Sequence, residues 1–482
     1  MDGRENDFSE STRDVVIVGG GLSGLATAIA LAGSNGVEKS FEGNCLPSVT
    51  LFESRRQCGG RAGSFSTPDG QTVDYCQHLA MGCCRNFLSL MRQAGLSDRF
   101  QQIDELNYSV AGRPVVRVRP SRWLPPPLHW LPALASMSFL SVGDRLRLIR
   151  AVSSLMRTRA EDLREVAAQA WLREHRQSSL AIARFWEPIL VSALGDQIGN
   201  VSMSMVHKVL VDGFVASSHS SRLYVPTVSL SDLIGDRLTA FAQSLGTDVC
   251  TGDAVTAIEP SGDPVHRWRV RSKRRRVNTQ HVVIATAWFR YASLAGSLGI
   301  EGLSESEMDQ VPEAPITGVH LWFDRPLTQT PHMVMLDSLS QWWFRCPVGG
   351  GDPGYGQVVI SGSHDLRAMD HDEIVDRVVS ELRAHFPEGE AARLVRSKVV
   401  TDPRSVFSTS PATLNRRPTS DSGVGGIVLA GDFVDTGWPA TMEGAVISGR
   451  MAAAEIVRAM GSDNTVEIET VPRGRLLRWL RV

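Results

Sequence analysis

Cysteine is scarce in this chain. Seven of the 482 residues are cysteine, and no C-x-x-C pair has the spacing of a metal site. This composition excludes a disulfide-rich secreted scaffold and favours reduced thiols in the cytoplasm, with no structural metal. The N-terminal segment MDGRENDFSESTRD lacks the basic and apolar regions of a signal peptide, so we expect no export.

An excess of one charge is also missing. The chain has 50 basic and 52 acidic residues, so no global positive field is available to bind nucleic acid, and we expect no such partner. The basic run RSKRRR at 271–276 is interpreted as the solvated turn of a β-hairpin rather than a nucleic-acid patch. With 42% hydrophobic residues, the chain has the composition of a globular protein, and its length allows two to four domains.

Charged side chains are absent from residues 123–142, WLPPPLHWLPALASMSFLSV. Twenty such residues have the length of a membrane span. Four of them are proline, and clustered prolines break the helix that the hydrocarbon core requires, so we predict no transmembrane segment.

A glycine pattern opens the ordered part of the chain. The apolar run DVVIV at 14–18 predicts a strand, and GGGLSGLATAIALA predicts a tight turn followed by a helix. Gly19, Gly21 and Gly24 fit G-x-G-x-x-G, in which the glycines permit the turn, a close approach to a pyrophosphate and tight packing of helix on strand. Leu22 and Ser23 lie at the helix N-terminus that faces the anion.

Glu53 ends the next predicted strand, SVTLFE, where an acid accepts hydrogen bonds from the ribose of an adenosine. The alternative is that the glycines serve only to form a tight turn. That alternative gives Glu53 no role, so we predict a dinucleotide site. The distance from Gly24 exceeds the usual spacing of about 20 residues. We attribute the excess to a surface loop at 33–47.

Two further segments resemble a known superfamily. The segment SRRQCGGRAGSF after Glu53, with Gly60 and Arg61, resembles the second signature of the FAD-containing amine oxidases and carotenoid desaturases, which NAD enzymes lack. Arg61 can lie near the pyrophosphate or the flavin edge; the alternative is a solvated loop arginine. The segment 426–457 resembles the closing part of the same flavin site.

This resemblance implies FAD as the cofactor. It implies contacts to FAD from Ser54 at the first motif, from Asp432, and from the start of a helix near Met442, Glu443 and Ala445. It also implies that 248–260 and 281–287 form middle strands, with Val255 near the adenine.

A narrower resemblance is to the squalene-associated FAD-dependent desaturase family. It is carried by VDYCQHLAMG (73–82), ALGDQIGN (193–200), KVLVDGFVASSHSSRLYVPTVSLSDL (208–233) and TGWPATMEGAVISG (436–449). Tyr75 and Cys76 stand where that family has Asn-Gly.

The narrower resemblance implies reduction of the allylic C30 alcohol hydroxysqualene to squalene, a step that supplies hopanoid synthesis. The reaction needs a hydride from reduced flavin N5 and a proton for the departing hydroxyl. Candidate donors are His78, oriented by Asp74, and then Tyr224, Asp435 and Glu443; His78 also fits a packing or flavin-positioning role. An acid at Glu443 is also favoured by a helix dipole alone.

We predict an α/β fold with a discontinuous Rossmann-like FAD-binding domain and a mixed helical and β substrate-binding domain. The predicted ranges are 13–80, 201–290 and 401–460 for the first domain, 81–200 and 291–400 for the second, and 461–482 for a basic amphipathic tail. The GGGDPGYG segment at 349–356 is interpreted as a loop, so no second dinucleotide unit is expected. The electron donor is therefore either a molecule that visits the same site or another protein.

A C30 isoprenoid substrate resides in the bilayer, so residues 123–142 are interpreted as a membrane-docking surface or tunnel mouth, the alternative being a buried loop and helix. The tail RGRLLRWLRV at 473–482 fits both a helix on anionic lipid and a solvated tail. We expect a cytoplasmic protein at the inner membrane surface. The rival functions are a polyene or carotenoid desaturase and, from another class, a flavin-fold binding protein without catalysis; amine oxidation ranks behind both enzymes.

Overall fold

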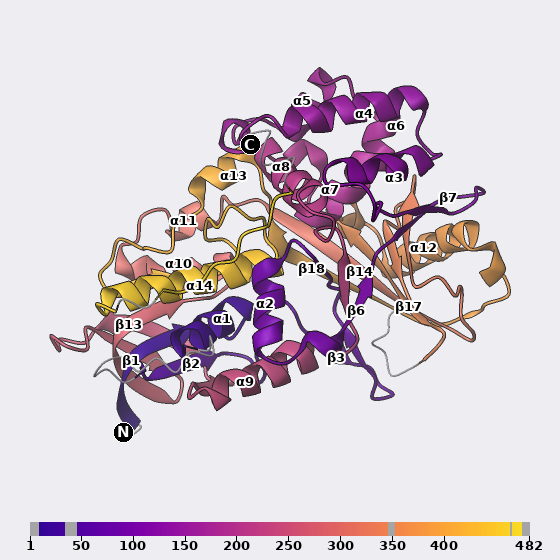
Figure 1. The fold of residues 1–482 in the computed structure, drawn as a ribbon. Coiled ribbons are helices and arrows are strands. Elements are labelled where there is room, and N and C mark those ends of the chain that lie inside the picture. The colour runs from indigo at the N-terminus through magenta and orange to yellow at the C-terminus, as the bar shows by residue number, and fades with distance from the viewer. Residues whose placement is uncertain (1–8, 34–45, 346–351, 463–464, 475–482) are drawn as a thin grey trace.

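The computed structural model describes residues 9–33, 46–345, 352–462 and 465–474 (Figure 1). Some predicted features fall wholly or partly outside these residues: the N-terminal segment, the loop at 33–47, the glycine-rich segment at 349–356, the tail at 473–482, and Cys45 and Cys346. The five cysteines that are described are all free thiols.

A seven-stranded sheet forms from distant parts of the chain. Its order is β10-β2-β1-β13-β12-β11, with β19 also paired to β13. The strands β10, β2, β1, β13 and β19 run parallel, whereas β11, β12 and β13 are joined antiparallel. Their bounds are Ser9–Val18 (β1), Val49–Glu53 (β2), Asp248–Thr251 (β10), Val255–Pro260 (β11), Trp268–Ser272 (β12), Arg275–Ile284 (β13) and Ile427–Leu429 (β19). The hairpin predicted around 271–276 is confirmed, because Arg271 pairs with Arg276.

Both faces of this sheet are buried. Successive side chains of a strand point to opposite faces, so β1 contributes to two cores. Val15 and Ile17 pack under helices on one face, and Val16 and Val18 pack into a second core on the other. The first face is covered by α1 (Leu22–Leu31), α14 (Met442–Ala459), α2 (Arg85–Gln93) and α9 (Thr239–Ser244). The opposite core includes α10 (Tyr291–Ala295) and α11 (Glu305–Met308).

A second seven-stranded sheet has the order β18-β14-β17-β16-β15-β7-β8. Its strands are Leu106–Val110 (β7), Val116–Val118 (β8), Glu313–Phe323 (β14), His332–Leu336 (β15), Trp342–Phe344 (β16), Tyr355–Ser361 (β17) and Leu394–Phe407 (β18), and α12 (His371–His385) packs on it. Two small sheets join Ser64–Ser66 (β3) to Thr72–Asp74 (β4), and Ala80–Met81 (β5) and Phe100–Ile103 (β6) to Leu223–Pro226 (β9).

A helical layer stands beside the second sheet (Figure 1). It contains α3 (Leu131–Ser136), α4 (Val142–Leu155), α5 (Ala168–Glu174), α6 (Ser179–Ala181), α7 (Glu187–Leu194) and α8 (Met203–His207), and α13 (Pro411–Arg416) adjoins it. The predicted α/β class, with its discontinuous Rossmann-like unit and mixed helical and β part, is confirmed.

The predicted domain ranges differ from the observed cores. Residues 401–407 belong to β18 of the second sheet, and 203–215 pack in the helical core, although the predicted FAD domain includes both. Conversely, 87–96 and 291–311 pack against the first sheet. Apolar periodicity shows that a segment is buried but not which of two neighbouring cores it enters, which accounts for the difference.

The charge-free stretch 123–142 forms a short helical turn at Leu128–Trp130, then α3 and the start of α4. Among the described residues, no helix has both the length and the hydropathy needed to cross a membrane.

Candidate active site

The predicted phosphate-binding turn joins β1 to α1. A Cβ atom at Gly24 would lie 1.9 Å from the Gly19 carbonyl oxygen, and one at Gly19 would lie 2.5 Å from the Ala285 oxygen. A Cβ at Gly21 would meet nothing within 4 Å. Packing therefore requires glycine at positions 19 and 24. Gly21 instead faces open space at the start of α1, where Leu22 and Ser23 begin the helix. This geometry fits a pyrophosphate at the helix N-terminus.

Glu53 lies at the end of β2 beside this turn. Its carboxylate accepts hydrogen bonds from the Gly20 N–H at 2.9 Å, the Arg55 N–H at 2.8 Å and the Ser54 hydroxyl at 3.1 Å. The link between β10 and β11 also reaches this strand end, because the Asp253 N–H donates to the Glu53 carbonyl at 3.0 Å. The fold thus gathers Glu53, Ser54 and Val255, the first residue of β11, around one strand end.

The second glycine motif packs on the first. Gly60 has a φ of +62°, and a Cβ there would lie 3.4 Å from the Gly21 Cα. The next residue, Arg61, forms an ion pair with Asp432 at 2.5 Å and donates to the Ser405 carbonyl at 2.7 Å. Two residues far apart in the sequence, both expected near FAD, are therefore in direct contact, and Arg61 is not a solvated loop arginine.

The third predicted segment begins α14 next to α1. Thr441 caps α14 by accepting from the Gly444 N–H at 3.2 Å, so the helix starts at Met442 and passes through Ala445, as expected. The Thr27 hydroxyl donates to the Gly449 carbonyl at 3.1 Å. The N-termini of α1 and α14 thus belong to two helices in direct contact.

Glu443 is held by α2. Its carboxylate accepts from the backbone N–H groups of Asn86 at 3.0 Å and Phe87 at 2.8 Å, and from the Asn86 side chain at 2.8 Å. The residue is 1% exposed, and burial raises the pKa of its carboxyl group. Because its oxygens satisfy the orphan donors that begin α2, we correct the proton-donor assignment: Glu443 has a structural role.

His78 is not oriented by Asp74 as predicted. Its Nδ1 lies 2.8 Å from the Cys76 carbonyl, whereas Asp74 accepts from the Ser64 hydroxyl at 2.7 Å and the Leu230 N–H at 2.8 Å. A carbonyl only accepts, so Nδ1 carries a hydrogen and the neutral ring keeps its free lone pair on Nε2. Asp74 is buried, which raises its carboxyl pKa.

Two other candidates occupy different places. Tyr224 on β9 is the register partner of Ala80 on β5. Because Ala80 is two residues after His78, the small sheet brings Tyr224 near His78. Asp435 forms an ion pair with Arg164 at 2.8 Å and is therefore already partnered.

Arg417 was not anticipated from the sequence. Its side chain is fully buried and donates to four backbone carbonyls: Phe433 at 3.1 Å, Trp438 at 2.8 Å, Asp432 at 3.1 Å and Val434 at 2.7 Å. This one guanidinium therefore shapes the loop from Asp432 to Trp438. No motif signals such a residue, because its partners are backbone atoms.

A buried polar cluster supports the turn before His78. His320 of β14 lies 2.9 Å from the Tyr355 hydroxyl through Nδ1 and 3.3 Å from the Tyr75 carbonyl through Nε2. Gln357 accepts from the Gln77 N–H at 2.7 Å. Burial lowers the pKa of His320 to about 4, so its ring is neutral at pH 7.

We predict that His320 makes the fold acid-sensitive. The folded protein binds fewer protons at this ring than the unfolded chain, so its stabilising contribution is complete above about pH 6.5 and is lost as the pH falls towards about 4. Between about pH 7.5 and about pH 5, the wild type should lose about 2 kcal/mol more unfolding free energy than His320→Gln. Urea unfolding at both pH values measures this difference. Equal losses in the two proteins would contradict it.

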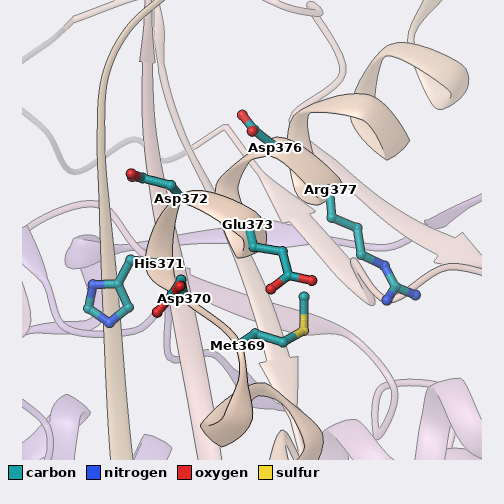
Figure 2. A pocket seen from close by; sticks show the side chains of 7 residues that line it. All are labelled: Met369, Asp370, His371, Asp372, Glu373, Asp376 and Arg377. Carbon is teal, nitrogen blue, oxygen red and sulfur yellow. The ribbon is translucent and has the colours of Figure 1, made fainter.

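A hollow on the second sheet's side of the molecule is not the flavin site. Figure 2 shows that its lining comes from the start of α12 and the residues just before it: Met369, Asp370, His371, Asp372, Glu373, Asp376 and Arg377. Four of these residues are acidic, and acidic side chains at a helix start are favoured by the helix dipole and repel phosphate.

Comparison with known proteins agrees with this geometry. Residues 22–457 match the family of flavin containing amine oxidoreductases. The chain is 25% identical to the chloroplastic/chromoplastic 15-cis-phytoene desaturase of Narcissus pseudonarcissus over 94% of this chain and 81% of that protein. It is 23% identical to a probable zeta-carotene desaturase of Synechococcus elongatus, over 92% of this chain and 98% of that protein.

Solved structures share the fold. A triple mutant of putrescine oxidase has a TM-score of 0.69 and 16% identity, covering 93% of this chain and all of that one. An oxidoreductase from Methanosarcina mazei has a TM-score of 0.67 and 14% identity with the same coverage. The prediction of FAD as the cofactor is confirmed, and the chain belongs to the flavin containing amine oxidoreductase family.

Proposed function

We propose that this protein is an FAD-dependent oxidoreductase that reduces hydroxysqualene to squalene. The observation that carries the proposal is the closing segment 436–449, TGWPATMEGAVISG, whose sequence resembles the squalene-associated family. Arg417 donates to the Trp438 carbonyl of this segment, and the Arg61–Asp432 ion pair joins the residues just before it to the second glycine motif. A family-specific sequence thus lies beside the residues expected to hold FAD.

The reaction replaces the allylic hydroxyl by hydrogen. When bound, reduced FAD would supply the hydride that replaces the hydroxyl, and the hydroxyl would leave as water with one proton delivered by the protein. The protein must hold the alcohol against the cofactor, exclude water and deliver that proton.

We place the proton donor at His78 or Tyr224. Protonated His78 presents Nε2–H, since Nδ1 is held by the Cys76 carbonyl. Tyr224 lies across the small sheet, next to the segment that carries His78. Asp74 supports Leu230 and Ser64 and acts only as a positioning residue.

The second candidate function is desaturation of a polyene such as a carotenoid. It is favoured by the similarity to carotenoid desaturases at 22% to 25% identity. Oxidised FAD would then accept a hydride from one carbon of the hydrocarbon, and a base or solvent would take a proton from the neighbouring carbon. A flavin-fold protein that binds without catalysis is the third outcome.

One experiment separates these functions. Photoreduced holoprotein is mixed anaerobically with hydroxysqualene, and in a second arm oxidised holoprotein is mixed with phytoene. We expect reoxidation of the flavin and formation of squalene in the first arm only. Reduction of the flavin by phytoene would support the desaturase, and no reaction in either arm would support a binding protein.

The same assay tests the proton donor. In single turnover with hydroxysqualene, we expect His78→Ala or Tyr224→Phe to slow squalene formation by about 10²-fold or more while FAD content is unchanged. Thr256→Ala, at an exposed position of β11, serves as the control and should react at the wild-type rate. A wild-type rate in both His78→Ala and Tyr224→Phe would remove these residues from proton delivery.

The proposal also places the protein at the cytoplasmic face of the membrane, because a C30 isoprenoid partitions into the bilayer.

A further inference from the structure

Exposed apolar side chains are concentrated in one part of the chain. Seven of the large hydrophobic residues that face solvent come from residues 123–180: Trp123, Leu124, Leu128, Leu131, Val142, Leu146 and Leu180. Trp123 is 94% exposed and Val142 is 69% exposed. Single exposed apolar residues need no explanation, but a group of this size indicates an interaction surface.

The first part of this group is a closed loop, residues 121–129, which we call the finger. The Ser121 N–H donates to the His129 carbonyl at 2.8 Å and closes its base, and the Leu128 N–H donates to the Pro125 carbonyl at 2.8 Å. His129 is buried, whereas Trp123 points to solvent. Three consecutive prolines limit the freedom of the loop, so it presents its apolar side chains with little entropy left to lose.

The second part is the start of α4, which is fixed to α3. Arg145 donates to the carbonyls of Ala135 at 2.9 Å, Met137 at 2.8 Å and Leu140 at 3.0 Å. Val142, Leu146 and Arg150 are spaced four residues apart, so they share the exposed face of α4. Figure 1 shows α3, α4 and α6 together at the upper right of the molecule.

Arginine outnumbers acidic residues in this part of the chain. Residues 106–160 contain nine arginines and a single acidic residue, Asp144. That carboxylate is buried and forms an ion pair with Arg147 at 2.7 Å, so it contributes little negative charge to the surface. Arg122 also pairs with Asp104 at 3.1 Å and Arg159 with Glu161 at 3.7 Å, just outside this range. The other arginines still outnumber the nearby carboxylates, so the region has a local positive field although the chain as a whole is nearly neutral.

The C-terminal strap, residues 465–474, ends at the finger. Its Glu469 N–H donates to the Asn86 side chain at 2.9 Å, which fixes the strap to α2. At the other end, the Gly474 N–H donates to the Ala216 carbonyl at 2.8 Å, and a Cβ on Gly474 would lie 3.1 Å from the Pro126 Cβ. The sequence that follows is RLLRWLRV, which alternates arginine with apolar residues.

We infer that the finger, the exposed face of α4 and the end of the strap form one docking face for an anionic lipid bilayer. Trp and Leu side chains enter the interface, and the arginines bind lipid headgroups. A protein partner or a second copy would need no such excess of arginine. The inference goes beyond the proposed reaction, because the surface binds lipid whichever apolar substrate the enzyme uses.

Vesicle flotation of the full-length holoprotein tests the docking face. We expect binding to vesicles that contain phosphatidylglycerol, weak binding to pure phosphatidylcholine, and release at high salt. The double variant Trp123→Glu with Leu128→Glu should weaken partition at least tenfold. Val265→Glu with Val395→Glu adds the same charge at exposed apolar sites elsewhere, 60% and 67% exposed, and should bind as the wild type.

Flavin absorbance per mole and the single-turnover rate with solubilised substrate should be unchanged in both double variants, which separates this test from that of the reaction. Equal vesicle binding by the two double variants would overturn the inference. So would a wild type that ignores anionic vesicles, or a self-association that only the finger variant loses.

Discussion

Gly449→Val is expected to yield a protein without bound FAD and with a large loss of stability. A Cβ atom at Gly449 would lie 2.4 Å from the Ser23 carbonyl oxygen and 3.0 Å from the Ala26 Cβ, both on α1. Valine would push α14 away from α1 and disturb the two helix starts that border the cofactor. We expect a loss of about 3 kcal/mol or more of unfolding free energy, the upper range for overpacking.

Ala454→Val is the matched control, because it makes a similar change of side chain on the half-buried side of the same helix. Flavin absorbance per mole of protein and thermal unfolding measure both effects. If Gly449→Val retained FAD and unfolded at the same temperature as Ala454→Val, α1 and α14 could separate without consequence.

Arg417→Met should release the loop from Asp432 to Trp438 and abolish tight FAD binding. Methionine keeps much of the apolar stem but leaves three buried carbonyls and one partly buried carbonyl without their donor. We expect destabilisation on the order of 4 kcal/mol, because each unsatisfied buried group costs about 1–3 kcal/mol and part of this is recovered by water. Lysine carries one ammonium group in place of the planar fork, so Arg417→Lys should restore only part of the loss.

The neighbouring Arg416 is exposed, so Arg416→Met provides the control. Isothermal titration with FAD measures affinity, and limited proteolysis reports whether the loop opens. If Arg417→Met bound FAD like Arg416→Met, the guanidinium would not be required for the shape of the loop.

The phosphate-binding half of the site could be predicted because its signals are local. A strand, a glycine turn and a helix follow one another within residues 14–31, and each constrains its neighbours. The closing segment was predicted by resemblance, and the structure adds its contacts with the first motif through Arg61 and Asp432.

The rest of the site depends on contacts that no local pattern encodes. Arg417 and His320 bind backbone or partners from other strands, so their residue types alone carried no signal. The proton-donor role predicted for Glu443 is wrong for the same reason. An acid in the first turn of α14 is expected to interact with the N-terminus of α14, yet the Glu443 carboxylate caps a different helix, α2.

The contact between α1 and α14 also sets a condition on synthesis. The Thr27 hydroxyl and the Gly449 carbonyl are 422 residues apart, and β1 pairs with β13 far downstream. The first helix therefore leaves the ribosome long before α14 is synthesised. Its apolar face stays without this packing partner until nearly the whole chain has been made. We therefore expect FAD to bind after translation is complete, and a chain stalled before α14 to need chaperones.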